Sequence, residues 1–174
     1  MSQSTPSRDE PLRLPAGARV ACVVSSYHSD ITRRMARSAE ATLVRAGLEP
    51  ERWHVIDAPG AFELPLIAKR LAAREDVDAV LGFGLVLKGE TEHDRYISNA
   101  VAQGFMDASL ETDTPVLFGV LTCTTLEQAQ RRSRDQGQGG LDKGREVALA
   151  AVGALQALAQ ASGPLAPALQ EESR

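Results

Sequence analysis

Residues 88–93 combine a glycine, the expected start of a helix and a histidine in the sequence Lys-Gly-Glu-Thr-Glu-His. Free N–H groups at the start of a helix bind anions, and Gly89 would let an anion approach the backbone closely. Because histidines titrate near neutral pH, His93 beside such an anion can supply a proton. The same segment also fits a simple helix start that Thr91 caps, with His93 in solvent. These residues therefore predict either an anion site with a proton donor or a helix start without a chemical role.

Two other turns offer side chains that can bind a planar or polyhydroxylated molecule. Tyr27 and His28 follow an apolar run, where the tyrosine ring either stacks on a heterocycle or covers the edge of a helix. Residues 59–63 have the sequence Pro-Gly-Ala-Phe-Glu, and Gly60 in this tight turn would admit a ligand close to the backbone. Glu63 lies where a helix begins, so its carboxylate either complements the helix dipole or hydrogen-bonds a polyol or an amine.

Four cations in the last third of the chain differ in what they indicate. Arg131, Arg132 and Arg134 lie in the last turn of an expected helix, where the helix dipole favours positive charge and needs no ligand to explain it. Lys143 lies near the start of the next helix, where the dipole disfavours a cation and Asp142 only partly offsets this. Lys143 therefore predicts an anionic ligand or partner nearby.

All these residues follow strands or flank helices in an alternating pattern. Apolar runs predict strands at residues 19–25, 54–57, 78–86 and 115–121, and helical spacing predicts helices at residues 30–46, 62–74, 92–111, 126–134 and 143–160. Gly47 is expected to stop the first of these helices. Such alternation predicts an α/β protein, and right-handed crossovers favour a flavodoxin-like three-layer α/β/α sandwich with a four-stranded parallel sheet. Ligands of such folds bind beyond the carboxyl ends of the strands, so the turns described above are expected to converge there.

Length and composition fit one globular domain of 174 residues, with 43% hydrophobic and 24% charged residues. We expect the domain at residues 17–161, between flexible tails at residues 1–16 and 162–174 that mix Ser, Pro and charged residues. The net charge of -4, without a basic patch, argues against nucleic acid as a partner. No signal peptide or membrane-spanning run is visible, and Cys22 and Cys123 lie in apolar runs as buried thiols would, so we expect a cytoplasmic protein.

Several other chemistries lack their sequence patterns. The chain has no Gly-x-x-x-x-Gly-Lys-Ser/Thr phosphate loop and no Gly-x-Ser-x-Gly nucleophile elbow. His28, His54 and His93 do not have the spacing of metal ligands, so no metal site is expected. At 4% aromatic residues, the chain offers few side chains to enclose the flavin of an electron carrier.

Taken in order, the motifs resemble the lumazine synthase family over residues 18–160. The resemblance rests on Tyr-His at 27–28, Pro-Gly-Ala-Phe-Glu at 59–63, Gly-Leu-Val-Leu-Lys-Gly-Glu-Thr-Glu-His at 84–93, Phe-Gly-Val-Leu-Thr at 118–122, Glu-Gln-Ala at 127–129 and Asp-Lys-Gly at 142–144. It implies condensation of 5-amino-6-(D-ribitylamino)uracil with 3,4-dihydroxy-2-butanone 4-phosphate to 6,7-dimethyl-8-ribityllumazine, the precursor of riboflavin. The resemblance implies no cofactor for this reaction.

The resemblance also implies a role for each matching residue. His93 would be the catalytic proton shuttle, and the phosphate would be bound by Gly89, Glu90, Thr91 and Arg132. The pyrimidine and its ribityl chain would be bound by Tyr27, His28, Ala61, Phe62, Glu63, Val86, Leu87, Lys88, Phe118 and Lys143. In the family, the counterparts of Phe118, Arg132 and Lys143 reach the site from a neighbouring subunit, which implies a homopentamer with active sites at subunit interfaces. Riboflavin synthase would be the pathway neighbour.

Two departures from the family pattern leave alternatives open. Asp-Arg-Tyr follows His93 where the family often has an aromatic residue directly. The loop at residues 133–141 is longer than the compact loop of many members, so Arg131 or Arg134 can take the place of Arg132, and we expect a pentamer rather than the sixty-subunit shell that some members form. The main alternative function is a non-catalytic relative that binds riboflavin or a lumazine. A second is a flavodoxin-like phosphate-binding module.

Overall fold

The computed structural model describes residues 12–164, and its elements alternate between strand and helix. The strands are β1 (Val20–Ser25), β2 (Trp53–Ala58), β3 (Ala79–Leu87) and β4 (Val116–Cys123). The α-helices are α1 (Ser29–Arg45), α2 (Leu64–Ala72), α3 (His93–Thr112), α4 (Leu126–Ser133) and α5 (Lys143–Ala161). All nine of these elements were predicted, whereas the short 3-10 helices η1 (Pro50–Arg52) and η2 (Gln136–Gln138) were not.

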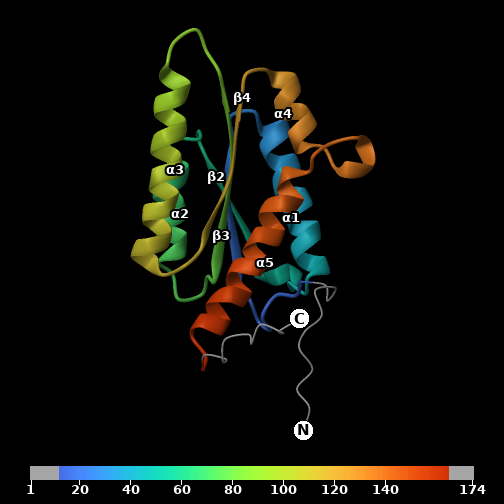
Figure 1. Ribbon diagram of the computed structural model, residues 1–174, viewed down its shortest axis with the longest axis vertical. Coiled ribbons are helices and arrows are strands. Elements are labelled where there is room, and N and C mark those ends of the chain that lie inside the picture. Colours follow the sequence, from blue (N-terminus) through green and yellow to red (C-terminus); the bar gives the residue numbers. More distant parts are fainter. Residues whose placement is uncertain (1–11, 165–174) are drawn as a thin grey trace, which may run out of the picture.

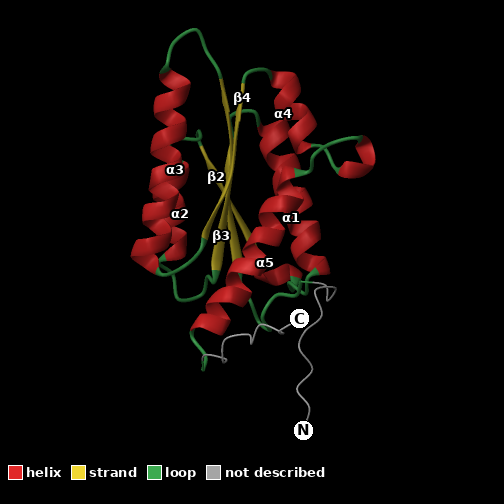
Figure 2. Ribbon diagram, in the orientation of Figure 1, coloured by secondary structure: helices red, strands yellow, loops and turns green. Residues whose placement is uncertain are grey.

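The strands form a parallel sheet in the order β2-β1-β3-β4. Helices α2 and α3 cover one face of this sheet, and α1, α4 and α5 cover the other (Figure 1, Figure 2). The predicted three-layer α/β/α sandwich is therefore confirmed. Because every strand runs in the same direction, their carboxyl ends meet at one edge of the sheet, at the upper end of the molecule in Figure 1.

The central strand β1 shows why two helical layers are needed. Every residue of β1 is buried, and successive side chains point to opposite faces of the sheet. Cys22 belongs to the core under α1 and α5, where it packs with Met35, whereas Val23 belongs to the core under α2 and α3 with Phe105. Cys22 and Cys123 are both buried free thiols, as predicted.

The end of α1 follows the prediction that Gly47 stops the helix. Gly47 has a φ of 104°, in the left-handed region that glycine adopts readily. Its N–H donates to the carbonyl of Val44 at 3.0 Å, and the N–H of Leu48 donates to the carbonyl of Leu43 at 2.9 Å. These paired bonds satisfy the last carbonyls of the helix in the Schellman arrangement.

The edge strand β2 and the start of the packed chain both differ from the prediction. β2 is longer than the strand expected at residues 54–57 and lies at the edge of the sheet, where Val55 and Ile56 are each 43% exposed. Leu14 is buried and its N–H donates to the carbonyl of Ala46 at 2.9 Å, so the packed part of the chain extends upstream of residue 17.

Residues 1–11 and 165–174 of the expected tails lie outside the described residues. Within residues 12–164, no helix is long and apolar enough to cross a membrane.

Candidate active site

A cavity of about 520 Å³ lies at the carboxyl ends of β1, β2 and β3. It brings together most of the residues that the sequence predicted for a site: Tyr27, His28, Ala61, Phe62, Glu63, Val86, Leu87, Lys88, Gly89, Thr91 and His93. Gly60, Leu85, Asp94 and Ile97 complete its lining. Four predicted residues do not line it: Glu90, Phe118, Arg132 and Lys143.

Tyr27 and His28 form one wall of the cavity, directly after β1. His28 has a φ of 58° in the left-handed region, which is uncommon for a residue with a side chain. Its carbonyl accepts from the N–H groups of Ile31 at 3.0 Å and Thr32 at 3.1 Å, so the backbone of His28 begins α1. The His28 ring meets the Tyr27 ring edge-on, with centroids 4.9 Å apart. Tyr27 is 69% exposed, which leaves its ring available to stack on a planar ligand.

The turn after β2 holds a carboxylate at the mouth of the cavity. Glu63 is the residue that precedes α2, and its side chain makes no capping hydrogen bond to the helix. Its Oε2 lies 3.0 Å from the position that a Cβ on Gly60 would occupy, so a side chain there would crowd the carboxylate. Glu63 thus lacks the capping bond of a purely structural residue, and its oxygens can accept hydrogen bonds from a polyol or an amine.

The turn between β3 and α3 lies one residue later than the sequence predicted, because β3 ends at Leu87 and α3 begins at His93. The Lys88 N–H donates to the carbonyl of Cys123 at 2.9 Å, which ties this turn to the end of β4. The expectation that Thr91 caps the helix is wrong: Glu92 takes the cap position, and the Thr91 hydroxyl only accepts from the His93 N–H at 3.4 Å. Gly89, Glu90 and Thr91 therefore form the turn ahead of the helix, and His93 is its first residue.

The other three predicted residues that do not line the cavity lie elsewhere on the protomer. Phe118 points from the middle of β4 toward α3, where it packs edge-on against Phe105 and stays 43% exposed. Arg132 lies in the last turn of α4, and Lys143 is the first residue of α5. Within the protomer, the anion beside Lys143 is Glu146 one turn later, with Nζ 2.6 Å from Oε2.

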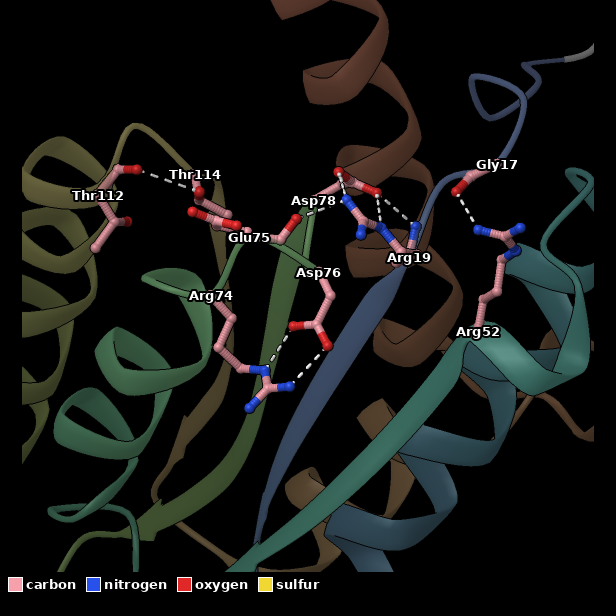
Figure 3. Close-up of polar contacts among 9 residues, drawn as sticks. All are labelled: Gly17, Arg19, Arg52, Arg74, Glu75, Asp76, Asp78, Thr112 and Thr114. Atoms are coloured by element: carbon pink, nitrogen blue, oxygen red, sulfur yellow. Dashed lines mark hydrogen bonds and ion pairs between the residues drawn. The ribbon is translucent and has the colours of Figure 1, made fainter.

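A second cavity, of about 550 Å³, lies at the opposite, amino end of the strands. Figure 3 shows that both arginines of its lining, Arg19 and Arg52, already have partners within the chain. Arg19 pairs with Asp78 at 3.2 Å, and this hydrogen bond raises the pKa of Arg19. Arg52 donates to the carbonyl of Gly17 at 2.8 Å. The arginines at this end of the sheet are therefore engaged within the chain, whereas the cavity beside His93 presents groups that a substrate can use.

The described residues, 12–164, hold no group of three or more His, Cys, Asp or Glu side chains arranged to bind a metal ion. The lining of the candidate site offers imidazole, carboxylate, ammonium and aromatic groups.

Comparison with known proteins identifies the family. The model of the 6,7-dimethyl-8-ribityllumazine synthase family matches residues 17–159. The chain belongs to this family. A 6,7-dimethyl-8-ribityllumazine synthase of Thermus thermophilus is 41% identical over 147 residues, which are 84% of this chain and 92% of the relative. One of Desulfotalea psychrophila is 43% identical over 136 residues, 78% and 86% of the two chains. One of Leuconostoc mesenteroides is 40% identical over 131 residues, 75% and 82% of the two chains.

The part of the chain that matches the lumazine synthase family contains the whole cavity and also Phe118, Arg132 and Lys143. Sequence reasoning missed two apolar residues of the lining. Leu85 lies two positions before Leu87, on the same side of β3, and Ile97 lies one turn after His93 on α3. The periods of strand and helix were signals that would have included both.

Proposed function

We propose that the protein is a 6,7-dimethyl-8-ribityllumazine synthase that condenses 5-amino-6-(D-ribitylamino)uracil with 3,4-dihydroxy-2-butanone 4-phosphate. The observation that carries this proposal is the cavity at the strand ends, which gathers an exposed aromatic ring, a carboxylate and a histidine from Tyr27, Glu63 and His93. The names of the relatives support the same activity. The residues divide between two substrates, one planar and polyhydroxylated and one phosphorylated.

The chemistry needs orientation and proton transfer. Tyr27 stacks on the pyrimidine, and Glu63 accepts hydrogen bonds from the ribityl hydroxyls. The pyrimidine amine then attacks the ketone carbonyl, and loss of water gives an imine. Elimination of phosphate follows, and ring closure with loss of a second water completes the lumazine. His93, which lines the same cavity, moves protons between these steps, while binding of both substrates in one cavity supplies proximity.

For the phosphate, we assign Arg132 rather than its neighbours. Arg132 is half-buried, whereas Arg131 and Arg134 are exposed. The charge of Arg132 acts on the Cys123 thiol at the end of β4, where it opposes the rise in the pKa of Cys123 that burial causes. Its positive charge therefore lies beside the end of β4 but outside the cavity of its own chain, as the proposed role toward a neighbouring subunit requires. A guanidinium matches the geometry of phosphate oxygens and stabilises the charge of the leaving group.

A homopentamer, with active sites at subunit interfaces, is part of the proposal. Two observations support it: Phe118, Arg132 and Lys143 do not line the cavity of their own protomer, and large apolar side chains in α2, in α3 and in the turn ahead of α2 are exposed. The exposed fractions are 61% for Phe62, 72% for Leu66, 73% for Tyr96, 56% for Met106 and 75% for Leu110. Exposed apolar groups in such number mark an interaction surface.

We also infer a cytoplasmic location, which the buried free thiols Cys22 and Cys123 support. The product would then pass to riboflavin synthase.

Turnover tests the proposal directly. The purified protein is incubated with both substrates, and lumazine formation is followed by absorbance. We expect catalytic turnover without added metal or cofactor. Stoichiometric binding of riboflavin or a lumazine without turnover would instead support a non-catalytic carrier. Phosphate binding without turnover, independent of subunit association, would support a simple phosphate-binding module.

A further inference from the structure

Two polar side chains of α1, one turn apart, reach the residues next to the proposed substrate-binding cations. Arg34 donates from Nη1 to the hydroxyl of Ser133 at 3.1 Å, and Ser133 directly follows Arg132. Ser38 donates to Oδ1 of Asp142 at 2.5 Å, and Asp142 directly precedes Lys143. One face of α1 thus contacts the chain directly beside Arg132 and directly beside Lys143.

Both contacts are shielded from solvent at the receiving end. Ser133 is fully buried and Asp142 is 6% exposed, so water cannot easily replace a lost partner. Asp142 has a φ of 48° in the left-handed region, and its Oδ1 also accepts from the Arg145 N–H at 3.1 Å. The side chain of Asp142 therefore fixes the first turn of α5 from two directions.

The backbones of α1, α4 and α5 meet at the same place. A Cβ on Gly144 would lie 2.2 Å from the carbonyl oxygen of Met35, so only glycine allows α5 to approach α1 this closely. Met35 directly follows Arg34 on α1. In addition, the Asp142 N–H donates to the carbonyl of Arg134 at 2.9 Å, which ties the start of α5 to the end of α4.

We propose that Arg34 and Ser38 are positioning residues, which fix Arg132 and Lys143 for the substrates of a neighbouring subunit. The inference rests on the proposed function, because it takes the roles of both cations from it. Arg132 and Lys143 have long side chains, so their reach depends on where the backbone carries them. Arg34 acts through Ser133 on the phosphate-binding residue, and Ser38 acts through Asp142 on the pyrimidine-binding residue.

Steady-state kinetics of paired variants test this division. Arg34→Met keeps the aliphatic stem but removes the donor, and we expect the KM for the phosphorylated ketone to rise while the KM for the pyrimidine stays nearly constant. Ser38→Ala should instead raise the KM for the pyrimidine and leave the KM for the phosphorylated ketone nearly constant. Because a hydrogen bond is lost in each case, the rise should be roughly three- to tenfold. Ser38→Thr keeps the hydroxyl and should restore the KM, which a purely structural loss would not predict.

Ser109→Ala provides the matched control. Ser109 on α3 is also partly buried, and its hydroxyl accepts from the Val116 N–H at 2.9 Å and donates to the Phe105 carbonyl at 3.0 Å. This variant should lower the melting temperature as much as Ser38→Ala but leave both KM values unchanged. If Ser38→Ala does not fold, Arg34→Met decides alone.

The outcomes separate the inference from the proposed function. Unchanged KM values in both α1 variants, or equal rises for both substrates, would overturn the positioning role while the unaltered protein still turns over. Absence of turnover by the unaltered protein would overturn the proposed function, and the positioning role with it.

Discussion

At the scale of single residues, the site combines groups with different surroundings. His93 is the first residue of α3 and lines the cavity beside Lys88 and Thr91. Arg132 lies outside the cavity, on α4 on the other face of the sheet. Proton transfer and phosphate binding are therefore assigned to separate groups. Substitution of Arg132 should change mainly a KM, and substitution of His93 should change mainly kcat.

Arg132→Ala should raise the KM for the phosphorylated ketone far more than the KM for the pyrimidine. A charge-assisted hydrogen bond contributes about 1.5–3 kcal/mol, so the expected rise is roughly ten- to a hundredfold. Steady-state kinetics with each substrate varied in turn give the two constants. Arg131→Ala, in the same turn but exposed, is the control and should change neither. A rise in Arg131→Ala or Arg134→Ala instead of Arg132→Ala would move the role to that residue.

His93→Ala should lower kcat and leave the pyrimidine KM nearly unchanged, because the proposal assigns pyrimidine binding to Tyr27 and Glu63, which line the cavity from other elements. General acid–base groups commonly contribute about 10²–10⁴-fold, and we expect a loss near 10²-fold because the condensing carbonyl and amine are already reactive. Single-turnover and steady-state rates measure the effect. A variant with full kcat would reduce His93 to a helix-end residue.

At the scale of elements, the sequence predicted the alternation of strands and helices because buried strands and amphipathic helices have distinct periods. The Gly47 stop was equally local and was predicted. The start of α3 was placed one residue too early because Thr91 has the side chain of a cap, whereas Glu92 takes that position after a strand that itself ends one residue later than predicted. The anchors at Arg34 and Ser38 were not predicted, since they join residues about a hundred positions apart. Local patterns carry no information on such partners.

The strands also protect the two thiols, and their reactivity tests this. Burial disfavours the thiolate, so it raises the pKa of Cys22 well above its ordinary value, and that of Cys123 as well, with Arg132 opposing the rise at Cys123. The folded protein therefore keeps these protons at a pH where the unfolded chain loses them, and the thiols lower its stability as pH rises through that range. We expect both to resist alkylation near pH 8 until the protein unfolds, Cys22 the more strongly. Mass spectrometry after timed iodoacetamide treatment measures this; rapid labelling of native Cys22 would contradict the packing of β1.

At the scale of the whole molecule, the proposed pentamer places His93 of one subunit beside Arg132 of the next. His93→Ala and Arg132→Ala would then damage different contributors to one site. When the two variants are mixed in equal amounts and refolded together, a site works only where an unaltered His93 meets an unaltered Arg132. Random ring assembly restores this pair at about one quarter of the sites. Activity, measured at a ketone concentration well below the KM of Arg132→Ala, should recover to about that fraction. If each site belongs to one chain, activity will stay at the mean of the two separate variants.

The family resemblance implies either free pentamers or shells built from twelve pentamers. We expect the loop between α4 and α5 to decide whether pentamers associate further. This loop projects away from the two helices (Figure 1), and the side chains of Gln136 and Gln138 on it are exposed. It is also internally bonded: Asp135 Oδ1 accepts from the Gln138 N–H at 2.9 Å, and the Asp135 carbonyl accepts from the Gly140 N–H at 3.0 Å.

A hydrogen-bonded projection does not easily fold aside, so it adds bulk where a neighbouring pentamer would dock, and any rearrangement would cost conformational freedom as well as these bonds. We therefore expect particles with the mass of five chains and weak association of pentamers at most. Sedimentation velocity or light scattering on the purified protein gives the mass. Particles with the mass of sixty chains would contradict the role assigned to the loop. The proposed activity would stand, because the family resemblance implies an active site within one pentamer in either assembly.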